Sequence, residues 1–321
     1  MVHLVYFAVE NLSEPTLETE AGANALVACL QSLLQNCLLL DFADYRVRTS
    51  LRKEVGVLVP HVRKRVEALL TLLAKRNRLV PAAETDSSGT GELQLLAEQA
   101  QKLALEIVII RDRDAWDESS SGVPRTSVAA YALTDFEARR SQELGVRHLR
   151  DAEVSGEEFI ERFLVPFLRY SRSLHIIDGV LGRYYFNNKD YRHTLQRVLA
   201  AIAAHCRFRD SCDEFAVTIH CRRGEGKTPN NIQREVKDAA HREGIDRFVQ
   251  VCFHDYDFKH DRCLASEIGG ISIGRGFDFF QWNTGLLNDT DIGFGNQDAE
   301  AILEPWHCRP HSLDESVDAG E

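Results

Sequence analysis

The chain alternates short apolar runs with longer stretches in which apolar residues recur at helical spacing. In the first half, three runs predict strands and three stretches between them predict helices: strands at residues 4–9, 37–42 and 105–110, and helices at 21–35, 51–77 and 92–103. Strands separated by helices favour a largely parallel sheet with helices packed on it. We therefore expect residues 1–150 to form one α/β domain, whose role the sequence does not indicate.

The second half alternates in the same way, although its sequence does not repeat that of the first half. Ser155, Gly156, Glu157 and Glu158 form a capping box that predicts the start of a helix. Further strands and helices follow: a helix at 157–170, strands at 174–177, 214–220 and 247–253, and helices at 191–205 and 231–243. We expect residues 155–310 to form a second α/β unit, with a mixed sheet flanked by helices.

Composition restricts the class of protein. With 44% hydrophobic and 27% charged residues, the 321-residue chain is typical of a globular protein. No run of 18 apolar residues exists, so we expect no membrane span. The N-terminus lacks the basic start of a secretory signal, and the eight cysteines form no CxxC pairs, which favours a reducing, cytoplasmic compartment.

Charge is distributed unevenly along the chain. The net charge is −11, yet residues 161–262 hold 18 Lys and Arg against 14 Asp and Glu, a local balance of +4. Residues 281–321 hold nine acidic residues and one arginine. A mildly basic centre favours a phosphate-bearing partner, with nucleic acid as one possibility. We expect the last residues, 311–321, to be a disordered acidic tail because they contain little apolar surface.

The stretch FKHDRCLASEIGGISIGRGFDFF at residues 258–280 predicts a β-hairpin. Isoleucines alternate with other residues after Gly269-Gly270, and this glycine pair is expected to form the turn. His260 and Arg262 stand two positions apart, so strand alternation would put them on one face.

Five residues of this stretch form a spaced motif, at successive intervals of two, five, seven and four positions: His260, Arg262, Glu267, Gly274 and Asp278. In this spacing the stretch resembles the catalytic motif of the phospholipase D superfamily, with Arg, Glu and Asp replacing the family's Lys, Asp and Asn. In such a motif His260 would attack phosphorus, Glu267 would fix the imidazole tautomer, and Arg262 would spread transition-state charge. We expect the phosphate contacts to come from Arg262, Arg275 and Asp278.

The second half also resembles the phospholipase D-like domain found at the C-terminus of proteins with a microtubule-interacting and trafficking module. Three segments carry this resemblance: Ile176-Ile177-Asp178, His260-Asp261-Arg262, and Gly274-Arg275-Gly276-Phe277-Asp278-Phe279-Phe280. Those domains bind membranes without catalysis, whereas catalytic superfamily members need two motifs around one site. With one motif, catalysis would require a homodimer that brings two His260 residues together. Bacterial chains with such a domain resemble components of phage-defence assemblies.

Three functions remain open. The chain is expected to recognise a phosphodiester or nucleic acid in a defence-type assembly, with very restricted hydrolysis at most. Alternatively, it is a homodimeric, metal-independent nuclease or phosphodiesterase that needs no cofactor. A third possibility is a metal-dependent nuclease in the first domain that uses Asp112 and Asp114. These two acids follow a predicted strand, as do three others, Glu10, Asp41 and Asp44.

Overall fold

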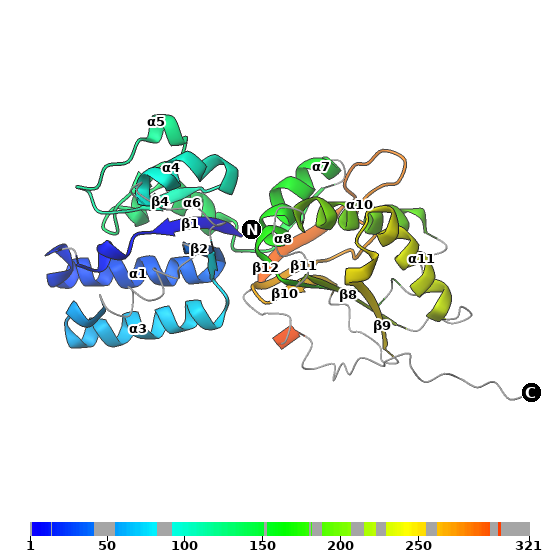
Figure 1. The fold of residues 1–321 in the computed structure, drawn as a ribbon, viewed down its shortest axis with the longest axis horizontal. Coiled ribbons are helices and arrows are strands. Elements are labelled where there is room, and N and C mark those ends of the chain that lie inside the picture. Colours follow the sequence, from blue (N-terminus) through cyan, green and yellow to red (C-terminus); the bar gives the residue numbers. More distant parts are fainter. Residues whose placement is uncertain are drawn as a thin grey trace, which may run out of the picture. The chain divides into compact units, whose positions relative to one another are not determined.

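The structure is a computed structural model. It describes residues 2–13, 15–41, 55–81, 92–150, 153–179, 181, 188–206, 215–222, 229–254, 262–295 and 301–302. The chain divides into two compact units, Met1–Gly145 and Val146–Glu321. Each unit contains one β-sheet with helices, so the predicted fold class of two α/β units is confirmed (Figure 1).

The sheet of the first unit has five parallel strands in the order β3-β2-β1-β4-β5. The strands are β1 (His3–Phe7), β2 (Cys37–Asp41), β3 (Leu79–Pro81), β4 (Ile107–Ile109) and β5 (Arg125–Thr126). All residues of β1, β2 and β4 are buried, which explains their continuous apolar runs, since helices cover both faces of the sheet. The strand order changes direction between β1 and β4.

Two long helices lie side by side on one face of this sheet, and a third lies on the other face (Figure 1). The pair is α1 (Glu20–Asn36) and α3 (Pro60–Lys75), and the third helix is α4 (Glu92–Leu103). The expected helix at 51–77 is therefore shorter, because Pro60 occupies its first turn, where the missing N–H costs nothing. Short elements complete the unit: η1 (Val9–Ser13), η2 (Pro15–Glu18), η3 (Val55–Val57), α5 (Glu118–Ser121), η4 (Tyr131–Leu133) and α6 (Asp135–Gln142).

The sheet of the second unit has seven strands in the order β6-β12-β11-β10-β7-β8-β9. Its strands are β6 (Arg147–Leu149), β7 (Ser173–Ile177), β8 (Ala216–Arg222), β9 (Val249–His254), β10 (Cys263–Ser266), β11 (Gly269–Ile273) and β12 (Thr290–Gly295). The β7-β8-β9 half is parallel, and the other pairs are antiparallel. The predicted mixed sheet is thus present. Strand β6, assigned to the first domain from the sequence, belongs to this sheet, so the boundary lies near 145 rather than 150.

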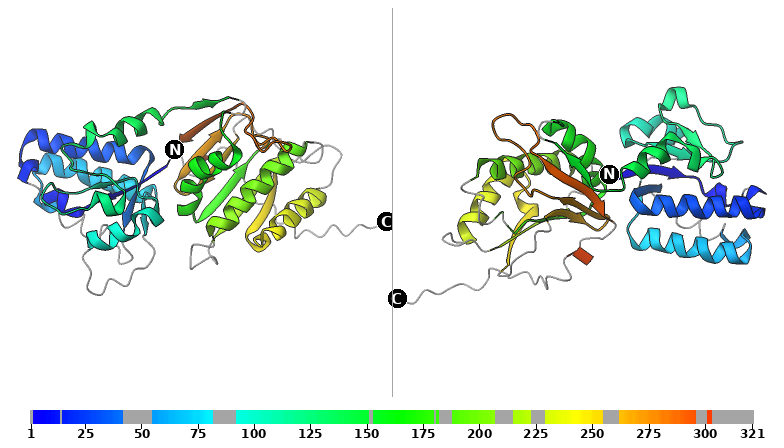
Figure 2. Two further views of the ribbon diagram at one scale, coloured as in Figure 1. Left: turned by 90° about the horizontal axis from the view of Figure 1, so that it is seen from above. Right: turned by 180° about the vertical axis from the view of Figure 1, so that it is seen from behind.

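The helices that the structure describes in this unit between residues 156 and 242 cover one face of the sheet (Figures 1 and 2). They are α7 (Gly156–Phe159), the π-helical turn η5 (Ile160–Leu164), α8 (Val165–Tyr170), α10 (Lys189–Cys206) and α11 (Pro229–Arg242); a further turn, η7 (Asp246–Phe248), precedes β9. On the opposite face, Ile302 packs against Ile177, Cys263 and Ala265. Within the described residues, the helices that we expected to flank the sheet therefore cover one of its faces.

The hairpin of β10 and β11 has its turn at Glu267-Ile268, not at Gly269-Gly270 as expected. Both glycines lie in β11, where Ser266 pairs with Gly269. Gly269 has φ of 141°, and a Cβ there would lie 2.7 Å from the carbonyl oxygen of Gly295. Close approach of the neighbouring strand β12, rather than the turn, explains why glycine occupies this position.

Candidate functional site

The predicted site residues lie on both sides of strand β10. His260 is outside the described residues, and Arg262 immediately precedes β10. Glu267 follows β10 in the hairpin turn, whereas Arg275 and Asp278 lie in the loop between β11 and β12. The structure brings Arg262, Arg275 and Asp278 together and separates Glu267 from them.

Glu267 has a structural role at the far end of the hairpin. At about 3.3 Å per residue, the five steps from Arg262 to Glu267 place the two roughly 16 Å apart. The Glu267 carboxylate accepts hydrogen bonds from the backbone N–H of Arg172 and from the N–H and hydroxyl of Ser173, the latter two at 3.1 Å. It thereby fixes the turn to the start of β7. The catalytic role expected for Glu267 stays a prediction, because His260, whose tautomer it was expected to fix, lies outside the described residues.

Arg262 lies against the carboxyl end of β7. Its Nε is 3.8 Å from Oδ1 of Asp178, a fully buried carboxylate. One of its terminal nitrogens donates a hydrogen bond to the carbonyl oxygen of Arg275. Gly276, with φ of 98°, leaves room for the guanidinium, since a Cβ there would lie 2.6 Å from Cδ of Arg262. The Gly-Arg-Gly sequence is thus explained in part by the passage of Arg262 across its second glycine.

Asp178 anchors the loop that carries Arg275. Its Oδ2 accepts a hydrogen bond from the N–H of Phe277 at 2.9 Å, and its Oδ1 accepts one from the N–H of Leu181 at 3.2 Å. Arg262 therefore faces a carboxylate that already holds the backbone on two sides. Arg262 and Asp178 together fix the geometry of the loop and contribute little net charge.

Arg275 and Asp278 form the more open part of the cluster. The Nε of Arg275 is 3.5 Å from Oδ2 of Asp278, and 44% of the Arg275 side chain is exposed. Burial raises the pKa of Asp278 despite the nearby arginines, and its Oδ1 has no hydrogen-bond partner among the residues that the structure describes. The ion pair between the two side chains is thus long and partly exposed, which leaves the Arg275 guanidinium accessible to a ligand.

The first turns of α10 complete this cluster, and the sequence analysis missed them. Burial, together with Asp178 and Asp278, raises the pKa of Tyr191, which places its hydroxyl in the field of both acids. Thr194 accepts a hydrogen bond from the N–H of Phe280 at 3.0 Å, and Asp190 accepts one from the N–H of Trp282 at 3.0 Å. The polar residues on the first two turns of a predicted helix were the only signal for this role.

In the first unit, the acids after the strands that the structure describes do not gather into a metal-holding group. Asp114 is bound by the Arg111 side chain, with its shortest contact at 2.8 Å, and hydrogen bonds from Arg111 hold the pKa of Asp114 low. Asp112 and Glu10 are exposed, Asp41 is buried, and Asp44 lies outside the described residues. Among the residues that the structure describes, no group of three or more His, Cys, Asp or Glu side chains is arranged to hold a metal ion.

Asn11 bridges the point between β1 and β4 where the strand order reverses. In such sheets, ligands usually bind in the crevice at this point. Asn11 is fully buried, and its Nδ2 donates to the carbonyl oxygen of Ile109 in β4 at 2.7 Å. The N–H of Ala8 donates to the same oxygen at 2.9 Å. These bonds join the ends of β1 and β4.

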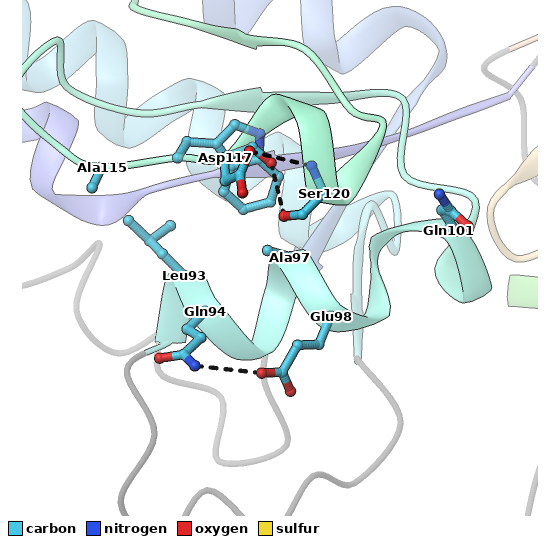
Figure 3. A pocket seen from close by; sticks show the side chains of 9 residues that line it. Leu93, Gln94, Ala97, Glu98, Gln101, Ala115, Asp117 and Ser120 are labelled. Carbon is cyan, nitrogen blue, oxygen red and sulfur yellow. Dashed lines mark hydrogen bonds between the residues drawn. The ribbon is translucent and has the colours of Figure 1, made fainter.

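A hollow of about 710 Å³ lies between α4 and α5 of the first unit (Figure 3). Its lining includes the Trp116 ring, whose Nε1 donates to the carbonyl oxygen of Val123 at 2.8 Å. Two acidic residues, Glu98 and Asp117, also line it, and no lysine, arginine or histidine belongs to the lining that the structure describes. This hollow therefore does not complement a phosphate.

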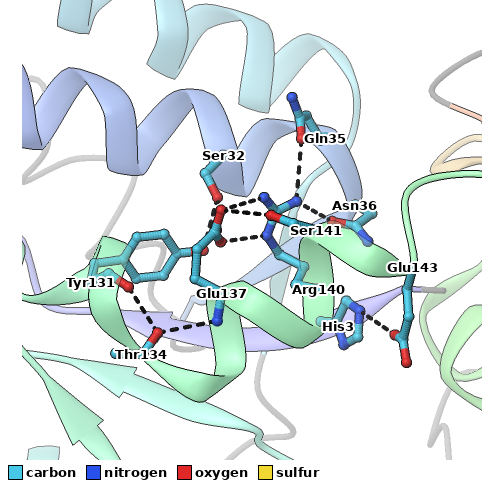
Figure 4. A network of polar contacts seen from close by, with 10 residues as sticks. All are labelled: His3, Ser32, Gln35, Asn36, Tyr131, Thr134, Glu137, Arg140, Ser141 and Glu143. Atoms are coloured by element: carbon cyan, nitrogen blue, oxygen red, sulfur yellow. Dashed lines mark hydrogen bonds and ion pairs between the residues drawn. The ribbon is translucent and has the colours of Figure 1, made fainter.

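A buried polar network in the first unit joins α6 to α1 (Figure 4). Arg140 donates to Glu137 at 2.7 and 2.8 Å and to Asn36 at 2.8 Å, and Ser32 donates to Glu137 at 2.8 Å. Burial opposes ionisation of Glu137, but hydrogen bonds from Arg140, Ser32 and Tyr131 outweigh it and lower its pKa to about 2. Since its charges are paired within the unit, this network stabilises the packing of two helices.

No protein-family model matches the chain, and no curated protein is similar enough to match it. None of the helices in the described part of the chain has the length and apolar character needed to cross a bilayer. The site is therefore interpreted from its own geometry.

Proposed function

We propose that the second unit binds a phosphate-bearing ligand at the carboxyl end of β7, with Arg275 as the principal contact. The observation that carries this proposal is the position of Arg275, whose side chain is 44% exposed beside the more enclosed Arg262. An arginine fork matches the oxygens of a phosphate and gives charge-assisted hydrogen bonds. Arg262 contributes by holding the Arg275 carbonyl, and hence the loop, in place.

The electrostatics of the cluster support an anionic ligand. An approaching phosphate would compete with Asp278 for Arg275, and the ion-pair contact between them is long, at 3.5 Å. Loss of the Arg275 counterion would favour protonation of Asp278, the direction in which burial already shifts its pKa. Residues 161–262, which supply Asp178, α10 and Arg262 to the cluster, have a positive balance of +4, which favours anions over cations.

The resemblance to phospholipase D-like domains is consistent with this proposal and extends it. By that resemblance, the ligand is a phosphodiester or nucleic acid, and the chain acts in the cytoplasm as a component of a defence-type assembly. A homodimer is part of the proposal, because it would bring two copies of the single motif together. Sedimentation measurements on the full chain test the dimer independently of ligand binding.

Calorimetric titration tests the binding proposal. The full chain is titrated with inorganic phosphate, a nucleoside monophosphate and a dinucleotide, and the same is done for Arg275→Ala. Loss of one charge-assisted contact to phosphate corresponds to about 1.5–3 kcal/mol, so we expect affinity to fall roughly 10- to 150-fold. Arg242→Ala, an exposed arginine of α11, is the matched control and should leave affinity unchanged. Equal affinities for the wild type and Arg275→Ala would overturn the proposal.

Hydrolysis is the alternative outcome of the same experiment. The probes are incubated with the wild type and with His260→Ala, with and without magnesium. Turnover that disappears in His260→Ala and needs no metal would favour the homodimeric phosphodiesterase. Turnover that needs magnesium and disappears in Asp112→Ala would instead locate a metal-dependent site in the first unit.

A further inference from the structure

Three histidines form a continuous hydrogen-bonded row across the parallel half of the second sheet. Nδ1 of His175 on β7 is 2.9 Å from Nε2 of His220 on β8. Nδ1 of His220 is in turn 3.0 Å from Nε2 of His254 on β9. Adjacent rings stack with centroids 5.2 and 5.3 Å apart and are nearly parallel, at 24° and 23°. Each step therefore joins the δ nitrogen of one ring to the ε nitrogen of the next.

The row lies on the sheet face opposite the described helices. His175 and Ile177 alternate with Leu174 and Ile176 along β7, and Ile177 packs against Cys263 and Ile302 on that face. His220 is paired in register with Ile177, which directs it to the same side. His220 and His254 are only 4% and 7% exposed, whereas His175 is half-buried. One end of the row is thus more accessible than its centre.

Two imidazoles of the row, those of His175 and His220, are neutral near pH 7 because their pKa values are lowered. Burial, with smaller contributions from its neighbours His175 and His254, lowers the pKa of His220 to about 3. Burial also lowers the pKa of His175, although nearby Glu267 opposes this effect. A neutral imidazole has one N–H donor and one bare nitrogen acceptor, so three neutral rings can form this row without a charged member.

Several described residues lie beside the row on the same strands. Cys252 is paired in register with His220, and burial raises the pKa of its thiol. Glu267 lies near His175, and Arg222 is paired in register with His254 at the end of β8. Beside the row, Gln250 donates to the Thr218 hydroxyl at 2.8 Å. The centre of the row therefore has only its own imidazoles and a thiol as ionisable neighbours among these residues.

We propose that His175, His220 and His254 form a proton relay across this face of the second unit. When Nε2 of His175 gains a proton, its Nδ1 proton passes to Nε2 of His220. The Nδ1 proton of His220 then passes to Nε2 of His254, and Nδ1 of His254 releases a proton. One proton enters and one leaves, each ring is neutral before and after, and the row changes from one hydrogen-bond direction to the other.

A metal ion fits this arrangement poorly. His220 uses opposite sides of its ring for its two neighbours, so the three imidazoles do not converge on one point as ligands of a zinc ion do. The described residues contain no other group of three potential ligands. The relay, unlike a metal site, uses both nitrogens of the central ring, and it does not depend on the phosphate-binding proposal.

Nitrogen NMR of the full chain labelled with 15N-histidine tests the relay. Protonated and bare ring nitrogens have widely separated 15N shifts, and a proton that hops between the two directions averages them. We expect both ring nitrogens of His220 to show intermediate shifts at pH 7. One fully protonated and one fully bare nitrogen in His220, or three signals that move together when Zn²⁺ is added, would overturn the proposal.

Substitution at the more accessible end gives a second test that does not alter the buried centre. His175→Gln removes the ring through which the proton enters, so the His220 and His254 nitrogens should separate into protonated and bare signals. His193→Gln, on α10 and outside the row, is the matched control and should leave the averaged His220 signals in place. Averaged His220 signals that persist in His175→Gln would show that the protons do not pass through His175, and the relay would be wrong.

Discussion

At the end of β4 in the first unit the charged side chains of Arg111 and Asp114 pair with each other, whereas at the end of β7 in the second unit the charged side chains pair incompletely. Arg111 binds Asp114 at 2.8 Å, and Asn11 bridges β1 and β4. In the second unit, Oδ1 of Asp278 has no hydrogen-bond partner among the described residues, and Arg275 stays 44% exposed. Placement beyond a strand end is therefore not sufficient for a site; the charge left uncompensated there distinguishes the two regions.

The largest contrast is expected from removing one acid in each region. Asp178→Ala leaves Arg262 without its buried counterion and two backbone N–H groups without their acceptor, which should cost about 3–5 kcal/mol of unfolding free energy. Asp114→Ala breaks a surface-proximal pair and should cost about 1 kcal/mol. Urea unfolding of both variants measures the difference. Equal losses would show that the two regions are held in the same way.

The sequence predicted more of the fold than of the site. Buried runs such as β1 and β2 were recognisable because strands covered on both faces stay apolar throughout. Short strands such as β5 and β6 were missed, since two or three residues give no period. Tyr191 approaches Asp178 and Asp278 only through tertiary packing, which no spacing along the chain encodes.

A second contrast concerns buried histidines in the two units, which should respond to pH with opposite signs. The pKa of His220 is lowered from 6.5 to about 3, so below pH 6.5 the unfolded chain gains a proton that the folded chain does not. We expect its contribution to cost the second unit on the order of 2 kcal/mol of stability between pH 6.5 and 5. The difference in urea unfolding between wild type and His220→Gln, measured at both pH values, isolates this effect.

His3 should show the reverse dependence. Burial alone would lower its pKa, but contacts of 2.8 Å to Glu106 and 3.2 Å to Glu143 outweigh burial and raise it. Its stabilising contribution is complete below the ordinary pKa of 6.5 and is lost as pH rises through the higher folded value. His3→Gln should therefore lower the stability of the first unit at pH 6 more than at pH 9. A larger effect at pH 9 would show that His3 is neutral in the folded chain.

The last contrast concerns glycines. Gly276→Ala places a Cβ 2.6 Å from Cδ of Arg262 at a φ of 98°, and should cost about 1–3 kcal/mol while displacing the Arg275 loop. Gly56→Ala in the first unit meets nothing within 4 Å and is the control, with a change below about 0.5 kcal/mol. Thermal unfolding measures both. If Gly276→Ala left the unfolding temperature unchanged, the Arg262 side chain would not need to pass across residue 276.

Hydrogen exchange with and without a saturating nucleoside monophosphate tests most directly whether the second unit holds the ligand site. If Arg275 binds the phosphate, backbone protection should rise in residues 262–278 and in the first turns of α10, because ligand binding stabilises the bound conformation. The segments after β1 and β4, residues 8–13 and 110–114, should exchange as before. Protection confined to those first-unit segments, or no protection in either region, would contradict the proposed site.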